Sequence, residues 1–382
     1  MLALTQTQRQ TAAYWLPGLA AGALAWLAFV LLGQTSLIRA SGLALVIVGM
    51  AMTLRRWGAV LAVIGGLALA FSPAFWSQTG GADSLNLPLT LAALVVAGLA
   101  GLALARFGSR PYLGAAVALV VFTVLFWSGL ATARSLRLTT LLTVWLLYLL
   151  VDLLHITNPR PDDGTLPGAP GAHHMVGILL LLALGVINDP LFTLILPAAA
   201  LGLVLSHVHV SRWYWLALAG IAALGVYGMV DAYVVSTWWS FPAAQAEAAG
   251  LRVPYVMVDG WREASRWIYL LGLVIEQFTV AGVALGVIGL ARLARWYPPL
   301  GSVTMVAYAT YTLFGLVYFG RNSAVLLLPL LVVQVFWMTY AVHALGEWLQ
   351  HGLHPNGATR WLAPAAYTLL PLALLLRITG SL

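Results

Sequence analysis

The chain contains no cysteine, no lysine and very few charged residues of any kind. Only 8% of its 382 residues are charged, whereas soluble domains carry about 25%. A chain with so few charges cannot cover a water-facing surface, which excludes a soluble enzyme, a disordered chain and a fibrous repeat. The lack of cysteine excludes disulfides, thiolate metal sites and thiol catalysis, but it leaves the redox compartment open.

All 18 basic side chains are arginines, and the formal net charge is +7. They stand singly or in pairs at the ends of apolar stretches, and no basic run is interleaved with aromatic residues. This pattern is typical of membrane anchors and does not indicate nucleic-acid binding.

Apolar residues make up 62% of the chain, and the mean hydropathy is +0.94. A membrane-spanning helix needs about 20 apolar residues in succession. Thirteen apolar runs are candidates: 14–33, 40–54, 57–75, 85–105, 112–131, 137–155, 174–188, 191–206, 212–230, 267–291, 301–319, 323–345 and 361–378. The sequence therefore predicts an all-α polytopic membrane protein of about 11–13 transmembrane helices. Only residues 188–190 separate two of these runs, which predicts either a tight hairpin or one broken helix.

The arginines also give an orientation. With the amino terminus in the cytoplasm and a retained first span from Tyr14, the short loops with Arg55 and Arg56, Arg106 and Arg110, and Arg292 and Arg295 all face inward. We therefore expect a multi-pass cell-membrane protein whose amino terminus is cytoplasmic.

One long polar segment divides the chain into three parts. We predict an N-terminal transmembrane bundle over 1–230, an extracytoplasmic interfacial segment over 231–266 and C-terminal transmembrane helices over 267–382. The middle segment mixes charges with aromatic residues, which suits short helices lying in the headgroup layer. Its candidate substrate-binding residues are Asp231, Asp259, Glu263 and Trp261.

An ionisable side chain inside a span is costly, so Glu276 is a functional candidate. It is predicted either to hold helices together as a protonated or paired carboxyl, or to serve as a substrate or proton site. Gly282 and Gly286, four residues apart, favour a close helix crossing. Asp152 and His155 lie one turn apart, a spacing that suits a carboxylate orienting an imidazole or a solvated pair.

Two histidine pairs invite a test for metal or haem. The adjacent His173 and His174 point in different directions on a helix, and His207 and His209 share a face only in an extended segment. The metal ligands therefore stay unassigned, and a divalent metal stays open as a cofactor.

The stretch 71–78, FSPAFWSQ, ends one span, and Asp83 follows it as the first acidic residue of the chain. Asp83 suits a helix N-cap, or an exposed acid at the edge of a lipid-facing cavity. Arg321 is predicted at the same outer level, where a guanidinium suits either an interfacial anchor or a phosphate.

These blocks carry a family resemblance. The segments concerned are Leu37-Ile38-Arg39, Arg55-Arg56, Ser72-Pro73-Ala74-Phe75-Trp76, Ala82-Asp83-Ser84, the tail from Gln277 to Leu290, Gly320-Arg321 and Leu328-Pro329-Leu330. Together they resemble the polyprenol-dependent membrane glycosyltransferases of the C-type fold, which are similar to protein O-mannosyltransferases. The resemblance covers most of the chain.

The resemblance implies an outward-facing cavity, a polyprenyl-phosphate sugar donor and transfer outside the cytoplasm. By matching position, Asp83 would be the second acidic residue of the family, near the acceptor or a metal, and Arg321 would contact the donor phosphate. The family also has a long first outer loop that bears a catalytic acid. Here residues 33–39 join the first two spans and contain no Asp or Glu.

Three hypotheses follow. In the first, the chain is an active glycosyltransferase in which Asp83, Asp231, Asp259 or Glu263 replaces the missing acid. The general-base catalysis that this acid supplies raises the rate by roughly 10²–10⁴-fold. In the second, it is a non-catalytic relative that acts as a lipid-binding subunit or scaffold, with partner membrane subunits. In the third, it is a transporter or flippase, favoured by Glu276 and the break at 188–190.

Overall fold

The computed structural model describes residues 6–80, 136–159, 172–230, 255–320, 323–352 and 359–380, with a few single residues between 95 and 102. The helices before the longest gap, with 3₁₀ turns labelled η, are α1 (Gln6–Leu31), α2 (Leu37–Leu54), η1 (Arg55–Trp57), α3 (Ala59–Ala70), α4 (Pro73–Trp76) and η2 (Ser77–Thr79). The next group comprises α7 (Leu136–Thr157), α8 (Ala172–Asn188), η4 (Pro190–Ile195), α9 (Leu196–Leu205) and α10 (Arg212–Val230). The last group comprises β1 (Tyr255–Val256), η6 (Val258–Arg262), α13 (Ala264–Trp296), α14 (Pro298–Val317), β2 (Tyr318–Phe319), α15 (Ser323–Leu326), α16 (Leu328–Gly352) and α17 (Thr359–Ile378).

The fold is an all-α polytopic bundle, as the hydropathy predicts. Every predicted apolar run that falls within the described residues coincides with a helix, because a backbone surrounded by lipid must satisfy its hydrogen bonds internally. By length and composition, seven of the described helices can cross a membrane, or eight if the bent pair of α3 with α4 and η2 counts as one span. The predicted runs 85–105 and 112–131 lie outside the described residues, apart from single positions.

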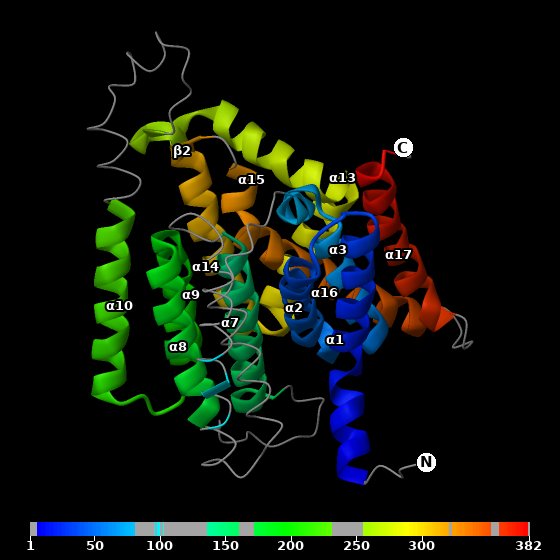
Figure 1. Ribbon diagram of the computed structural model, residues 1–382, viewed down its shortest axis with the longest axis horizontal. Coiled ribbons are helices and arrows are strands. Elements are labelled where there is room, and N and C mark those ends of the chain that lie inside the picture. Colours follow the sequence, from blue (N-terminus) through cyan, green and yellow to red (C-terminus); the bar gives the residue numbers. More distant parts are fainter. Residues whose placement is uncertain are drawn as a thin grey trace.

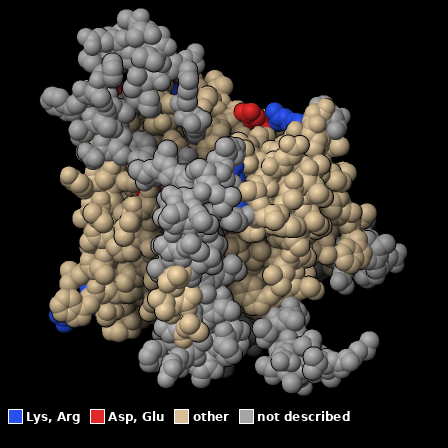
Figure 2. Space-filling model, viewed as in Figure 1, with Lys and Arg blue, Asp and Glu red and all other residues tan. Residues whose placement is uncertain are grey.

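The helices run between two ends of the bundle (Figure 1). We call the end that carries the amino terminus the N side and the end that carries the carboxyl terminus the C side. On the face that Figure 2 shows, the described surface between the two ends carries few charged side chains, as expected for a surface that contacts lipid.

The core is built around α16. In the apolar stretch of α16, 89% of the residues are buried, whereas only 11% are buried in the apolar stretch of the peripheral α10. Helix α16 packs against α3, α13, α14 and α17, so helices from the predicted 1–230 and 267–382 parts share one bundle.

The predicted close crossing at Gly282 and Gly286 is confirmed, and its partner is α16. A Cβ atom on Gly286 would lie 2.1 Å from Nε2 of Gln334, and a Cβ on Gly289 would lie 1.9 Å from the backbone oxygen of Trp337. The amide of Gln334 donates to the carbonyl of Gly282 (3.0 Å). Helices α13 and α16 can lie this close only because α13 carries glycine, which has no Cβ atom, at these positions.

The chain changes direction at Asp189 and within α13. At Asp189 the chain makes the tight turn of a hairpin: the side chain caps η4 by accepting from Leu191 N (3.0 Å), and η4 packs back on α8. Within α13, Thr279 has φ 63° and ψ 173°, which interrupts the helix. Figure 1 shows the part of α13 before this break lying across the C side. This corrects the single span predicted over 267–291, and the predicted surface segment 231–266 is described only from Tyr255 onward.

Candidate functional site

The stretch FSPAFWSQ forms a helix break on the C side. Pro73 begins α4, and the axis bends by 65° from that of α3. Since proline interrupts the ladder, the first N–H groups of α4 need new acceptors. Gln277 of α13 supplies one: its buried Oε1 accepts from the backbone N–H of Ala74 (2.7 Å).

Two arginines hold the other end of this break. Arg39 donates from Nη1 to the carbonyls of Thr79 (3.1 Å) and Gly80 (2.5 Å). Arg137 donates to the carbonyls of Gln78 (3.1 Å) and Gly80 (3.3 Å). A cation is favourable where the carbonyls of a helix end converge. Gly80, the last described residue before Asp83, is therefore held in place by two cations.

The predicted surface segment is attached to the strand that precedes Arg321. Strand β1 pairs antiparallel with β2, with Tyr255 opposite Phe319 and Val256 opposite Tyr318. The turn η6 follows and carries Asp259 and Trp261, both exposed at the C side.

The remaining contacts of this segment are polar. Arg262 lies 3.7 Å from Asp259 and also lies over the ring of Trp261. Glu263 is partly exposed and accepts from the hydroxyl of Ser265 (3.4 Å).

Arg266 anchors this segment to α14. Its side chain is buried and donates to the carbonyls of Gly315 (2.6 Å), Leu316 (3.1 Å) and Tyr318. These carbonyls lie at the end of α14, where no further helical N–H follows.

Three segments that are distant in sequence thus meet on the C side. Helix α4 packs against both α13 and α15. The hydroxyl of Tyr269 in α13 lies 2.5 Å from that of Ser323, which begins α15. As a result, the described residues closest in sequence to Asp83 and Arg321 belong to one packed unit with Asp259, Trp261 and Glu263.

Not all predicted site residues are located by the structure. Asp83, Asp231 and Arg321 lie outside the described residues. Glu276 lies just before the break in α13, and its side chain is exposed rather than packed between helices. Arg377 donates to the backbone carbonyl of Glu276 (2.9 Å), which loses its helical hydrogen-bond partner because of the break.

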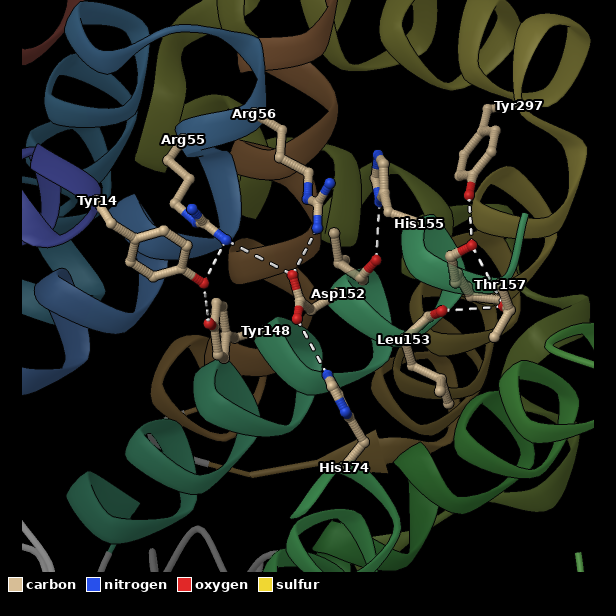
Figure 3. Close-up of polar contacts among 12 residues, drawn as sticks. Tyr14, Arg55, Arg56, Tyr148, Asp152, Leu153, His155, Thr157, His174 and Tyr297 are labelled. Atoms are coloured by element: carbon tan, nitrogen blue, oxygen red, sulfur yellow. Dashed lines mark hydrogen bonds and ion pairs between the residues drawn. The ribbon is translucent and has the colours of Figure 1, made fainter. Parts of the chain in front are cut away.

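The N side carries a second polar cluster, shown in Figure 3. Asp152 of α7 accepts from Arg56 (2.6 Å), lies 3.6 Å from Arg55, and is 3.0 Å from Nε2 of His174 in α8. Arg55 also donates to the hydroxyl of Tyr14 and stacks on its ring, with 3.4 Å from its guanidinium carbon to the ring centroid. That hydroxyl lies 2.8 Å from the hydroxyl of Tyr148.

The cluster corrects the predicted pairing of Asp152 with His155. Nδ1 of His155 donates to the carbonyl of Val151 (2.8 Å), and its ring packs on Tyr297. The imidazole that contacts Asp152 is His174, which reaches it from the neighbouring helix. The sequence singled out His173 and His174 but gave no signal for this contact.

A groove of about 500 Å³ also opens on the N side, between η1, α3, α16 and α17. Trp57 and Trp361 line it, together with His343 and Glu347, whose side chains are 3.3 Å apart. None of the site residues predicted from the sequence lines this groove.

No cluster of three or more metal-ligating side chains occurs within the described parts of the chain. Comparisons with protein-family models, curated proteins and solved structures found no match to the chain.

Proposed function

We propose that the chain is an integral-membrane glycosyltransferase that moves a sugar from a polyprenyl-phosphate donor to an acceptor on the C side. In this proposal the C side faces away from the cytoplasm, and the amino terminus lies in the cytoplasm. The supporting observation is the meeting of segments 71–80, 255–279, 318–320 and 323–326 at one end of the bundle. Those segments carry or adjoin the residues on which the family resemblance rests.

Each proposed role follows from the chemistry of the side chain. Arg321 binds the donor phosphate, because a guanidinium is permanently charged and offers forked donors. Asp83 takes the acceptor proton or holds a divalent cation, a contribution of roughly 10²–10⁴-fold in rate. Asp231, Asp259, Glu263 and Trp261 shape the acceptor site.

A second candidate is a non-catalytic, lipid-binding subunit of a larger membrane complex. The absence of Asp and Glu from residues 33–39 favours it, since the related enzymes carry an acid in that loop. Both candidates require a polyprenyl-phosphate site, and they differ in whether Asp83 matters for turnover.

The test has two arms. Lipids that co-purify with the wild type, Arg321→Ala and Arg295→Ala are identified by mass spectrometry, with Arg295 as an exposed control on the N side. We expect a polyprenyl phosphate in the wild type and the control and its loss in Arg321→Ala. Ordinary phospholipids alone, alike in all three samples, would overturn the proposal.

The second arm measures sugar transfer from a polyprenyl-phosphate donor. Asp83→Asn should abolish transfer while the protein keeps its elution volume and melting temperature. A bound polyprenyl phosphate without any transfer, together with stable co-purifying partner chains, would instead favour the lipid-binding subunit.

A further inference from the structure

The cluster on the N side carries more positive than negative charge. Arg55 and Arg56 are consecutive in η1, and within the described residues Asp152 is the carboxylate that lies within 4 Å of both. The three groups together have a net charge of +1, before any charge on His174. The arginines are 16% and 35% exposed, so they are shielded from water but still reachable.

Both guanidinium groups retain unused donors. Arg56 makes its described hydrogen bond through Nη2 alone. Nε of Arg55 is buried and has no hydrogen-bond partner among the described residues. The Nε atom of Arg55 is enclosed, so Arg55 contributes mainly its charge, and Arg56, which is 35% exposed, offers the donors that an anion can reach.

The cluster lies at the level of lipid headgroups. Tyr14 begins the apolar stretch of α1, the two arginines follow the end of α2, and His174 begins the apolar part of α8. Basic clusters between helices at this depth attract anionic headgroups. A phosphodiester offers two charged oxygens, which match the forked donors of arginine.

We propose that Arg55 and Arg56, with the hydroxyl of Tyr14, bind the phosphodiester of an anionic phospholipid. Asp152 is the internal counter-ion that orients the two arginines and competes with the lipid for them. This site is distinct from the proposed donor site, because it lies at the opposite end of the bundle and uses none of the same residues.

The test measures the melting temperature of the full-length protein in detergent with added phosphatidylglycerol, phosphatidylcholine or inorganic phosphate. We expect phosphatidylglycerol to raise the melting temperature and the other two to have little effect. Equal stabilisation by phosphatidylcholine, or full stabilisation by inorganic phosphate, would overturn the assignment to an anionic lipid.

Three variants separate binding from a purely structural role. Arg56→Gln should weaken the apparent affinity for phosphatidylglycerol about tenfold, because it removes a charged, forked donor. The control Arg295→Gln, also on the N side, should respond as the wild type does. Asp152→Asn should melt at a lower temperature without lipid, since the arginines lose their counter-ion, and should gain more from phosphatidylglycerol than the wild type.

A structural role alone predicts a different result. Arg56→Gln would then lower the melting temperature by the same amount with and without phosphatidylglycerol, and Asp152→Asn would gain no more from the lipid than the wild type. Either result would refute the proposed site.

Discussion

The crossing of α13 and α16 allows a prediction whose size follows from the geometry. Replacing Gly289 with alanine puts a Cβ atom 1.9 Å from the backbone oxygen of Trp337. Carbon and oxygen normally stay about 3.3 Å or more apart. The two helices would therefore have to separate locally by about 1.4 Å, because backbone cannot rotate away as a side chain can.

Such a separation is expensive because it disturbs the central helix of the bundle. A gap of 0.5–1 Å already forfeits roughly a quarter to a half of the attraction between facing atoms. Overpacking a well-packed core typically costs about 1–3 kcal/mol. Because the whole seam next to the buried α16 must open, we place Gly289→Ala at the upper end, near 3 kcal/mol.

The same helix provides a matched control. A Cβ added to Gly272 of α13 meets no atom within 4 Å. Gly272→Ala should thus be neutral or stabilise the helix by up to about 1 kcal/mol. Both variants are compared with the wild type by thermal unfolding in detergent, followed by the fluorescence of the 16 tryptophans.

We expect Gly289→Ala to melt about 6 °C or more below Gly272→Ala, at roughly 2 °C per kcal/mol for a chain of this size. Melting temperatures within 1 °C of each other would refute the close approach of α13 to α16 at Gly289. A drop of equal size in both variants would mean that glycine is needed for the helix itself rather than for the crossing.

Two further predictions concern the anchoring of the C side and the orientation of the bundle. Arg266→Gln should lower the free energy of unfolding by about 3 kcal/mol, since it leaves buried carbonyls of α14 without their donor. The control Arg262→Gln, at an exposed position, should change it by less than about 0.5 kcal/mol, and equal melting temperatures of the two variants would contradict the anchoring role. Since the natural chain has no cysteine, Ser265→Cys and Ser211→Cys each introduce a single thiol, exposed on the C side and the N side respectively. A membrane-impermeant maleimide should label Ser265→Cys in intact cells and Ser211→Cys only after permeabilisation, and the reverse pattern would invert the proposed orientation.

Hydropathy was sufficient to predict the described helices, because the lipid environment imposes one rule on every span: about 20 apolar residues with internally bonded backbone. The small-residue spacing of Gly282 and Gly286 likewise predicted a real crossing. The tight turn at Asp189 was one of two alternatives that the sequence left open, since a proline break permits either a hairpin or a broken helix.

The polar contacts could not be predicted in the same way. His174 is 22 residues from Asp152, and Arg56 is 96 residues away, so nothing in the local spacing reveals either partner. The break in α13 lies at Thr279, a β-branched residue that rarely adopts positive φ, and no sequence signal marks it. Glu276 therefore lies in a segment that crosses the C side, where a continuous helix would have carried it along a span.

Four arginines on the C side bind backbone carbonyls, which bears on how arginines are read for orientation. On the C side, Arg39, Arg137 and Arg266 donate to carbonyls at helix ends, and Arg377 donates to the carbonyl that the break in α13 releases. The fold holds these four side chains at their carbonyls. Exposed arginines are described on both sides: Arg212 and Arg295 on the N side, and Arg262 and Arg377 on the C side. Exposure therefore does not distinguish the two sides, and the expectation of a cytoplasmic N side rests on the arginines of the short loops. The paired cysteine labels at positions 211 and 265 test that expectation directly.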